Sequence, residues 1–119
     1  MDDKRIWEFE ASLWKADPEH YRESVDEHCL MVIPTPPFVL QGAEAIRAVS
    51  HTPQWSDVQF SKEHIARPEE GLIVIAYAIT ASKAGEAPYR ANCTSTYRRL
   101  AHDNWRVVQH QQTPHILAS

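Results

Sequence analysis

The sequence predicts an α+β fold in which N-terminal helices pack on one face of a curved antiparallel sheet. Its first half contains short segments whose apolar residues recur at helical spacing. Its second half, from Trp55 onward, consists of long alternating runs joined by short, turn-rich connections, a pattern that favours sequential antiparallel pairing. Helices followed by a run of strands are typical of the α+β class. We expect all 119 residues, 1–119, to form one domain.

Composition narrows the possible partners. The chain is 43% hydrophobic and 24% charged with a formal charge of -4, as in ordinary globular proteins. An acidic chain without a basic run is not expected to bind nucleic acid. The first fifteen residues, MDDKRIWEFEASLWK, carry too many charges for a signal peptide or a membrane span, so we expect a cytoplasmic protein with no membrane partner. We expect Cys29 and Cys93 to be free thiols.

The first predicted helix runs from Asp3 to Lys15. Its apolar residues form two adjoining stripes, made of Ile6, Phe9 and Leu13 and of Trp7, Ala11 and Trp14. At about 100° per residue, Glu10 falls inside this apolar arc, between Leu13 and Trp14. A carboxylate in such a position needs a partner.

Two more helices and one strand follow. In ADPEHYRESVDEH, Asp17 is placed to cap a helix and Pro18 suits its first position. The apolar run CLMVIP predicts a strand that the following prolines end. After VLQG, the segment AEAIRAV predicts a third helix entered through Gly42. We interpret His28 and Cys29, at the start of that strand, as a rim residue and a core thiol.

Four strands complete the expected fold. Their sequences are WSDVQFSKEHIA, LIVIAYAITASK, YRANCTSTYRRL and WRVVQHQQ. The last strand begins apolar and ends with polar residues on both faces, because side chains alternate along a strand. Either the strand runs out into water at that point, or one face lines a cavity.

Three segments together resemble the nuclear transport factor 2-like superfamily. They are the first helix with its Trp and Glu pattern, the link FVLQGAEAI, and the closing YRRLAHDNWRVVQHQQTPH. The chain is most similar to the SnoaL-like branch and to the association domain of calmodulin-dependent kinase, over nearly its whole length. The resemblance implies a cone-shaped sheet wrapped around the helices, with a pocket at the wide end and a homodimer formed through the outer sheet face.

The predicted strand LIVIAYAITASK has a pattern that agrees with burial on both faces. LIVIAYAIT is apolar at both parities, as expected for a strand covered on each side. We place the larger set, Ile73, Ile75, Tyr77 and Ile79, outward at the dimer interface. The smaller set, Leu72, Val74, Ala76 and Ala78, is then expected to leave room inside.

The resemblance to the kinase domain also implies inward positions on the last two strands. It matches Thr96 and Gln112 to inward positions at which that domain has arginines, so a carboxylate ligand of that kind is not implied. Alternation then places Asn92, Thr94, Thr96 and Arg98 inward, facing Val108, His110 and Gln112. Burying such a polar row without partners costs a few kcal/mol, about 1–3 for each unpaired group. A solvated or ligand-filled pocket removes that cost.

Glu10 and His110 are the two candidate catalytic residues. A pocket His titrates near neutrality and can act as a general acid or base, but it can equally be a neutral His bonded to Glu10, Asn92 or a Thr hydroxyl. Glu10 can serve as a base or as a structural carboxylate that ties the helix to the sheet through His110, Arg98 or a backbone amide. The sequence lacks both an inward Asp matching a ketosteroid isomerase and an Asp-Arg-Asp set matching a limonene epoxide hydrolase.

Two functional hypotheses follow. The first is a homodimer that binds a small organic ligand, with isomerase-like or cyclase-like acid-base activity left open. The second is a non-catalytic oligomerisation module whose cavity has no ligand. We expect no cofactor and no metal, since no His pair has metal-ligand spacing. We interpret the four tryptophans, Trp7, Trp14, Trp55 and Trp105, as core or dimer residues, with Trp7 or Trp14 as an alternative apolar pocket wall that stacks on a flat ligand. The expected ligand-binding residues are Trp14, Asn92, Thr94, Thr96, Arg98, Val108 and Gln112.

Overall fold

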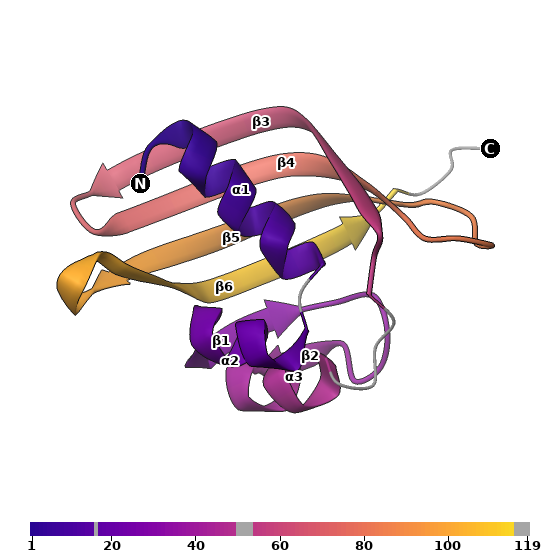
Figure 1. The fold of residues 1–119 in the computed structure, drawn as a ribbon, viewed down its shortest axis with the longest axis horizontal. Coiled ribbons are helices and arrows are strands. Elements are labelled where there is room, and N and C mark those ends of the chain that lie inside the picture. The colour runs from indigo at the N-terminus through magenta and orange to yellow at the C-terminus, as the bar shows by residue number, and fades with distance from the viewer. Residues whose placement is uncertain (16, 50–53, 116–119) are drawn as a thin grey trace.

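The computed structural model describes residues 1–15, 17–49 and 54–115. Within these ranges, three helices accompany a six-stranded, curved and unclosed mixed sheet (Figure 1). The helices are α1 (Asp3–Trp14), α2 (Pro18–Ser24) and α3 (Gly42–Val49). The strands are β1 (Val25–Val32), β2 (Val39–Gln41), β3 (Asp57–Glu69), β4 (Leu72–Ser82), β5 (Tyr89–Leu100) and β6 (Asn104–Pro114).

The predicted α+β class is confirmed. The strand order across the sheet is β2-β1-β6-β5-β4-β3, and β3 to β6 form the expected antiparallel meander. The remaining strands make the sheet mixed rather than wholly antiparallel, because β1 pairs with β6 in parallel and with β2 antiparallel. β1 therefore brings the helical half of the chain to the end of the meander.

Capping side chains fix where the helices begin. Asp2 accepts a hydrogen bond from the Arg5 amide at the start of α1, and Asp17 accepts one from the His20 amide at the start of α2. The cap at Asp17 and the Pro18 start agree with the sequence-based expectation. At the start of α3, a Cβ on Gly42 would lie 2.1 Å from the carbonyl oxygen of Asp26, so only glycine allows α3 to approach the chain this closely.

The core lies between the helices and the concave side of the sheet. α1 crosses the face formed by β3 to β6, while α2 and α3 lie beside β1 and β2 (Figure 1). The core-facing residues of β4 are Ile73, Ile75, Tyr77 and Ile79, all buried. The expectation that this larger set faces outward is therefore wrong. Large side chains fill the space under α1, and burying their apolar area stabilises the fold at about 25 cal/mol per Å².

Both cysteines are buried and free, and His28 at the surface is exposed. The outer face of β4 carries the smaller set, Leu72, Val74, Ala76 and Ala78, opposite in parity to the core residues. Among the described residues, no helix is long and apolar enough to cross a membrane.

Candidate functional site

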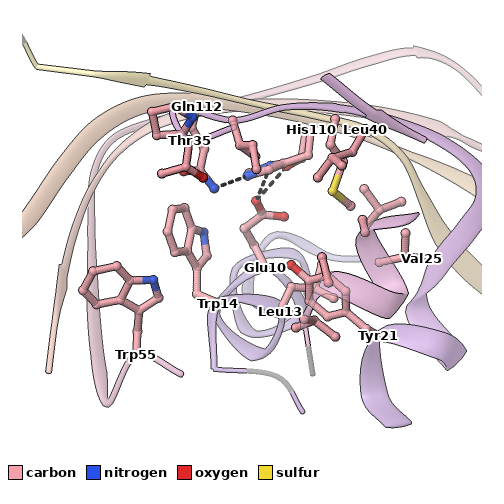
Figure 2. A pocket seen from close by; sticks show the side chains of 18 of the residues that line it. Glu10, Leu13, Trp14, Tyr21, Val25, Thr35, Leu40, Trp55, His110 and Gln112 are labelled. Atoms are coloured by element: carbon pink, nitrogen blue, oxygen red, sulfur yellow. Dashed lines mark hydrogen bonds and ion pairs between the residues drawn. The ribbon is translucent and has the colours of Figure 1, made fainter. Parts of the chain in front are cut away.

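A cavity of about 310 Å³ opens between the helices and the C-terminal half of the sheet. Side chains from α1, α2, α3, β1, β2, β5 and β6 line it, together with residues of the segments that precede β2 and β3 (Figure 2). Most of its wall is apolar, and the aliphatic lining residues are Leu13, Val25, Met31, Ile33, Pro34, Leu40, Ala45, Ala48, Val49 and Val107. The polar groups are few and are gathered mainly around Glu10, His110 and Gln112 (Figure 2).

Glu10 is a buried carboxylate, only 1% exposed, that α1 points at the sheet. Tyr77 of β4 and Ser95 of β5 both donate to its Oε2, the latter over 2.7 Å, and Tyr97 of β5 donates to its Oε1. Trp14 in turn donates to the Tyr77 hydroxyl over 2.9 Å. Three hydroxyl donors replace the water that burial removes, so the carboxylate joins α1 to two strands.

A directional chain of hydrogen bonds continues from Glu10 along the cavity wall. The Ser95 hydroxyl has one proton, which it donates to Glu10, so its oxygen accepts from Nδ1 of His110 over 2.7 Å. Nε2 of His110 is then unprotonated and accepts from the Gln112 amide over 3.1 Å. The Gln112 carbonyl accepts from the Tyr89 hydroxyl over 3.0 Å. This network assigns the His110 tautomer with the proton on Nδ1.

The electrostatics of the wall agree with a neutral His110. Burial lowers the pKa of His110, while the nearby charge of Glu10, whose Oε2 lies 3.7 Å from Nδ1, and the backbone of Thr94 act in the opposite direction. Burial and the Glu10 charge raise the pKa of Tyr77 and of Tyr97 well above the usual range. Both tyrosines are therefore hydrogen-bond donors at neutral pH.

Aromatic rings form one end of the cavity. Trp55 stacks on Tyr89 with ring centroids 5.8 Å apart, and the Lys83 ammonium lies 4.5 Å from the Trp55 centroid. The Trp14 ring packs edge-on against His110, with centroids 5.9 Å apart. Trp14, Trp55 and Tyr89 thus present apolar ring surface beside the polar groups of Gln112 and His110.

Tyr21 of α2 contributes a hydroxyl at another part of the wall. Among the described residues, no hydrogen bond to this hydroxyl is found, in contrast to the other three tyrosines. Burial, with smaller contributions from Glu10 and Cys29, raises the pKa of Tyr21 to about 12. The hydroxyl is therefore protonated at neutral pH and available as a donor.

Comparisons with solved structures place this arrangement in a known fold. A ketosteroid isomerase-like protein from Parabacteroides distasonis superposes with a TM-score of 0.78 at 17% identity, covering 94% of this chain and 86% of its own. An NTF2-like protein from Cytophaga hutchinsonii gives 0.77 at 19%, covering 97% and 100%. The association domain of C. elegans CaMKII gives 0.72 at 13%, covering 92% and 90%. The chain has the nuclear transport factor 2-like fold. No family model and no curated protein matches it by sequence.

Within this nuclear transport factor 2-like fold, four of the predicted site residues line the cavity. They are Glu10, Trp14, His110 and Gln112. Their hydrogen bonds also match one of the two interpretations of Glu10, that of a carboxylate joining the first helix to the sheet, although Tyr77, Ser95 and Tyr97 make the bonds in place of Arg98.

The predicted inward set on β5 faces the opposite way. Thr94 and Thr96 bond with Gln109 on the outer face of the sheet, Asn92 bonds with His115, and Arg98 lies at the surface 3.2 Å from Asp26. The inward positions are the alternate ones, Tyr89, Ala91, Cys93, Ser95 and Tyr97. The expectation for Asn92, Thr94, Thr96 and Arg98 is wrong because a shift of one residue turns every side chain of a strand to its other face.

The prediction that Val108 faces the cavity is wrong for a different reason. Tyr97 pairs with Val107 and Thr96 pairs with Gln109, so Val108 is an extra residue with no partner across the ladder. Such a bulge reverses the alternation of faces along a strand. Val107 before the bulge and His110 and Gln112 after it therefore all face the cavity, and Val108 does not.

Sequence reasoning missed Ser95 and Tyr21 and assigned Trp55 to the core or the dimer. Ser95 is found if the more apolar parity of YRANCTSTYRRL is taken as the inward one, since Ala91, Cys93 and Tyr97 share its face. Tyr21 carries a weaker signal, as an aromatic residue in a short helix that otherwise exposes charges. Trp55 lies close to a segment outside the described residues, and no pattern in the sequence predicts that its side chain lines the cavity.

Proposed function

We propose that this chain binds a small organic molecule in the cavity between its helices and its sheet. The observation that carries the proposal is an open cavity of about 310 Å³ with mainly apolar walls, aromatic rings at one end and a short polar chain beside them. Small-molecule sites have volumes of about 300–1,000 Å³ and combine apolar walls with a few fixed polar groups. Membership of the SnoaL-like branch is part of this proposal, and a ketosteroid isomerase-like protein shares the fold.

Acid-base chemistry at His110 is the second candidate. A neutral imidazole at the wall of an apolar cavity is a suitable proton acceptor, and this property favours acid-base chemistry at His110. Both ring nitrogens of His110 are engaged, however, and Glu10 already accepts three hydroxyl groups. Proton transfer by His110 requires Gln112 to release Nε2, so binding is the better supported function.

Self-association through the outer sheet face is part of the proposal. The central outer side chains of β4 and β5 are small and uncharged, namely Val74, Ala76, Ala78, Thr94 and Thr96. One of them, Ala78, is largely buried in the single chain, with 7% of its surface exposed. A sheet surface whose centre carries no charge suits a second copy of the same sheet. The association domain of C. elegans CaMKII also has this fold.

A titration with prodan, an uncharged naphthyl ketone whose emission shifts to the blue in apolar surroundings, tests binding. We expect saturable, blue-shifted emission with the wild-type protein. Ala48 lines the cavity but is exposed, so Ala48→Trp narrows the entrance with little effect on the core. The variant is expected to lose the signal while keeping the wild-type unfolding midpoint. Equal signals from both proteins, or none from the wild type, would count against the cavity as a binding site.

A further inference from the structure

The cavity wall has an unusual charge balance for a binding site. Among the described residues that line it, no Lys or Arg is present, and Glu10 is the single carboxylate. Burial keeps His110 neutral, so this residue supplies no positive charge at neutral pH. The Lys83 ammonium, which lies near the Trp55 ring, also bonds Glu86 over 3.3 Å and is not among the lining groups.

A charged ligand is therefore disfavoured on two grounds. An anion would lose its hydration in an apolar space and would find no cation there to compensate for that loss. It would also lie close to the negative charge of Glu10, at the low effective dielectric of a buried site. A cation gains little from Glu10, because three protein hydroxyls already surround that carboxylate.

Tyr21 supplies a polar group that the wall leaves unused. Its hydroxyl lines the cavity, stays protonated at neutral pH, and has no hydrogen-bond partner among the described residues. Its oxygen is not among the buried side-chain atoms left without a partner in the described part of the chain, so it is open to the cavity, and an acceptor on the ligand that replaces water there adds about 0.5–1.5 kcal/mol. Figure 2 draws Tyr21 and Trp55 at opposite ends of the labelled wall, so a ligand that contacts both spans the cavity.

We propose that the ligand is an uncharged, mainly apolar molecule that packs against Trp14 and Trp55 and presents an acceptor oxygen to the Tyr21 hydroxyl. This inference rests on the proposed function, because it names the chemical class that the same cavity takes. It assigns Tyr21 as a specificity-determining residue of the site.

Three two-ring probes of nearly equal shape test the inference by tryptophan fluorescence titration at neutral pH. They are 2-acetylnaphthalene, which carries an uncharged acceptor, 2-isopropenylnaphthalene, which lacks it, and 2-naphthoate, which is an anion. We expect the ketone to bind tightest and the anion to bind at least about tenfold more weakly than the ketone, the factor that corresponds to about 1.4 kcal/mol. Tyr21→Phe should weaken the ketone about fivefold, as expected for one lost hydrogen bond, and leave the hydrocarbon unchanged.

Each contrary result has its own meaning. Tighter binding of 2-naphthoate than of the ketone would overturn the uncharged class. A Tyr21→Phe variant that binds the ketone as the wild type does, or that loses ketone and hydrocarbon equally, would overturn the role of Tyr21. If none of the three probes binds at millimolar concentration, the inference fails; native mass spectrometry after incubation with a small-molecule cell extract, which is not limited to uncharged ligands, decides separately whether the cavity binds small molecules at all.

Discussion

Glu10 of α1 and Ser95 of β5, 85 positions apart in the chain, are joined by a hydrogen bond of 2.7 Å. The same Ser95 oxygen lies 2.7 Å from Nδ1 of His110. Ser95 is thus the link between the carboxylate that anchors the first helix and the imidazole that borders the cavity. Stability and the shape of the binding site depend on one polar network.

Removing the Glu10 carboxylate should destabilise the fold strongly. Glu10→Ala leaves the hydroxyls of Tyr77, Ser95 and Tyr97 without their acceptor and opens a cavity, so the free energy of unfolding should fall by about 3 kcal/mol or more. Urea unfolding measures the loss. The exposed Glu8 on the same helix, which pairs with Lys4 at 3.8 Å, is the matched control, and Glu8→Ala should cost less than about 0.5 kcal/mol. Similar losses in both variants would show that the buried network does not stabilise the fold.

The buried His110 predicts a loss of stability in acid. Burial lowers its pKa in the folded protein from the usual 6.5. As the pH falls below that value, the unfolded chain takes up a proton that the folded protein does not, so stability is lost between 6.5 and the lower folded pKa. The groups around the ring are Glu10, Ser95, Gln112 and Trp14, of which Glu10 alone carries a charge.

Urea unfolding at about pH 7.5 and about pH 5.5 measures this loss directly. We expect His110→Gln to reduce the difference in unfolding free energy between the two conditions. His102 lies exposed in the turn before β6, and His102→Gln should leave the difference as it is in the wild type. An unchanged difference in His110→Gln would mean that this residue titrates in the folded protein as it does in the unfolded chain.

The backbone around Gly42, the first residue of α3, leaves no room for a side chain. A methyl group on this residue would meet the Asp26 carbonyl oxygen at 2.1 Å, a backbone atom that no rotamer change can move. Gly42→Ala should therefore lower the free energy of unfolding by about 3 kcal/mol, at the upper end of the usual cost of overpacking. Gly85, whose added Cβ would meet nothing within 4 Å, is less suitable as a control because its φ is +81°, so Ala43→Ser on α3 serves instead. A gain in stability in Gly42→Ala would contradict the described approach of the two segments.

The uncharged centre of the outer sheet face predicts a homodimer that a single introduced charge dissociates. Ala76 lies in the middle of β4 on this face, and Ala76→Arg would bury an unpaired guanidinium between two sheets. We expect the wild type to sediment as a dimer and this variant as a folded monomer. Ala101→Arg, in the exposed turn between β5 and β6, should remain a dimer. A monomeric wild type, or a dimeric Ala76→Arg, would place self-association elsewhere or remove it.

The sequence predicts the elements of this fold better than the directions of their side chains. The helix start at Asp17 and Pro18 and the four strands of the meander follow from capping chemistry and alternation. The parity of β5 does not follow as directly, since its outward face carries Thr94 and Thr96, which bond with Gln109 rather than with a ligand. Reading the more apolar parity of β5 and the larger side chains of β4 as inward would have placed both Ser95 and the large β4 residues correctly.

The bulge at Val108 is beyond sequence reasoning of this kind. Nothing in WRVVQHQQ marks which residue lies unpaired, because the bulge depends on how β5 and β6 fit along their whole length. The family resemblance assigned Gln112 to the correct face and alternation from Gln112 did the same for His110, while alternation assigned Val108 to the wrong face. Tyr21 becomes visible as a site residue only once α2 is docked beside α1 and β1, since its position depends on tertiary packing.

Native mass spectrometry of the purified protein, followed by denaturing extraction, tests the central claim most directly. The protein is first incubated with a small-molecule extract of the expressing cells. The account predicts wild-type protein that carries the added mass of one small organic molecule per chain, which extraction releases and which Ala48→Trp does not carry. Bare polypeptide mass in the wild type under these conditions would contradict the account and favour an assembly module whose cavity has no ligand.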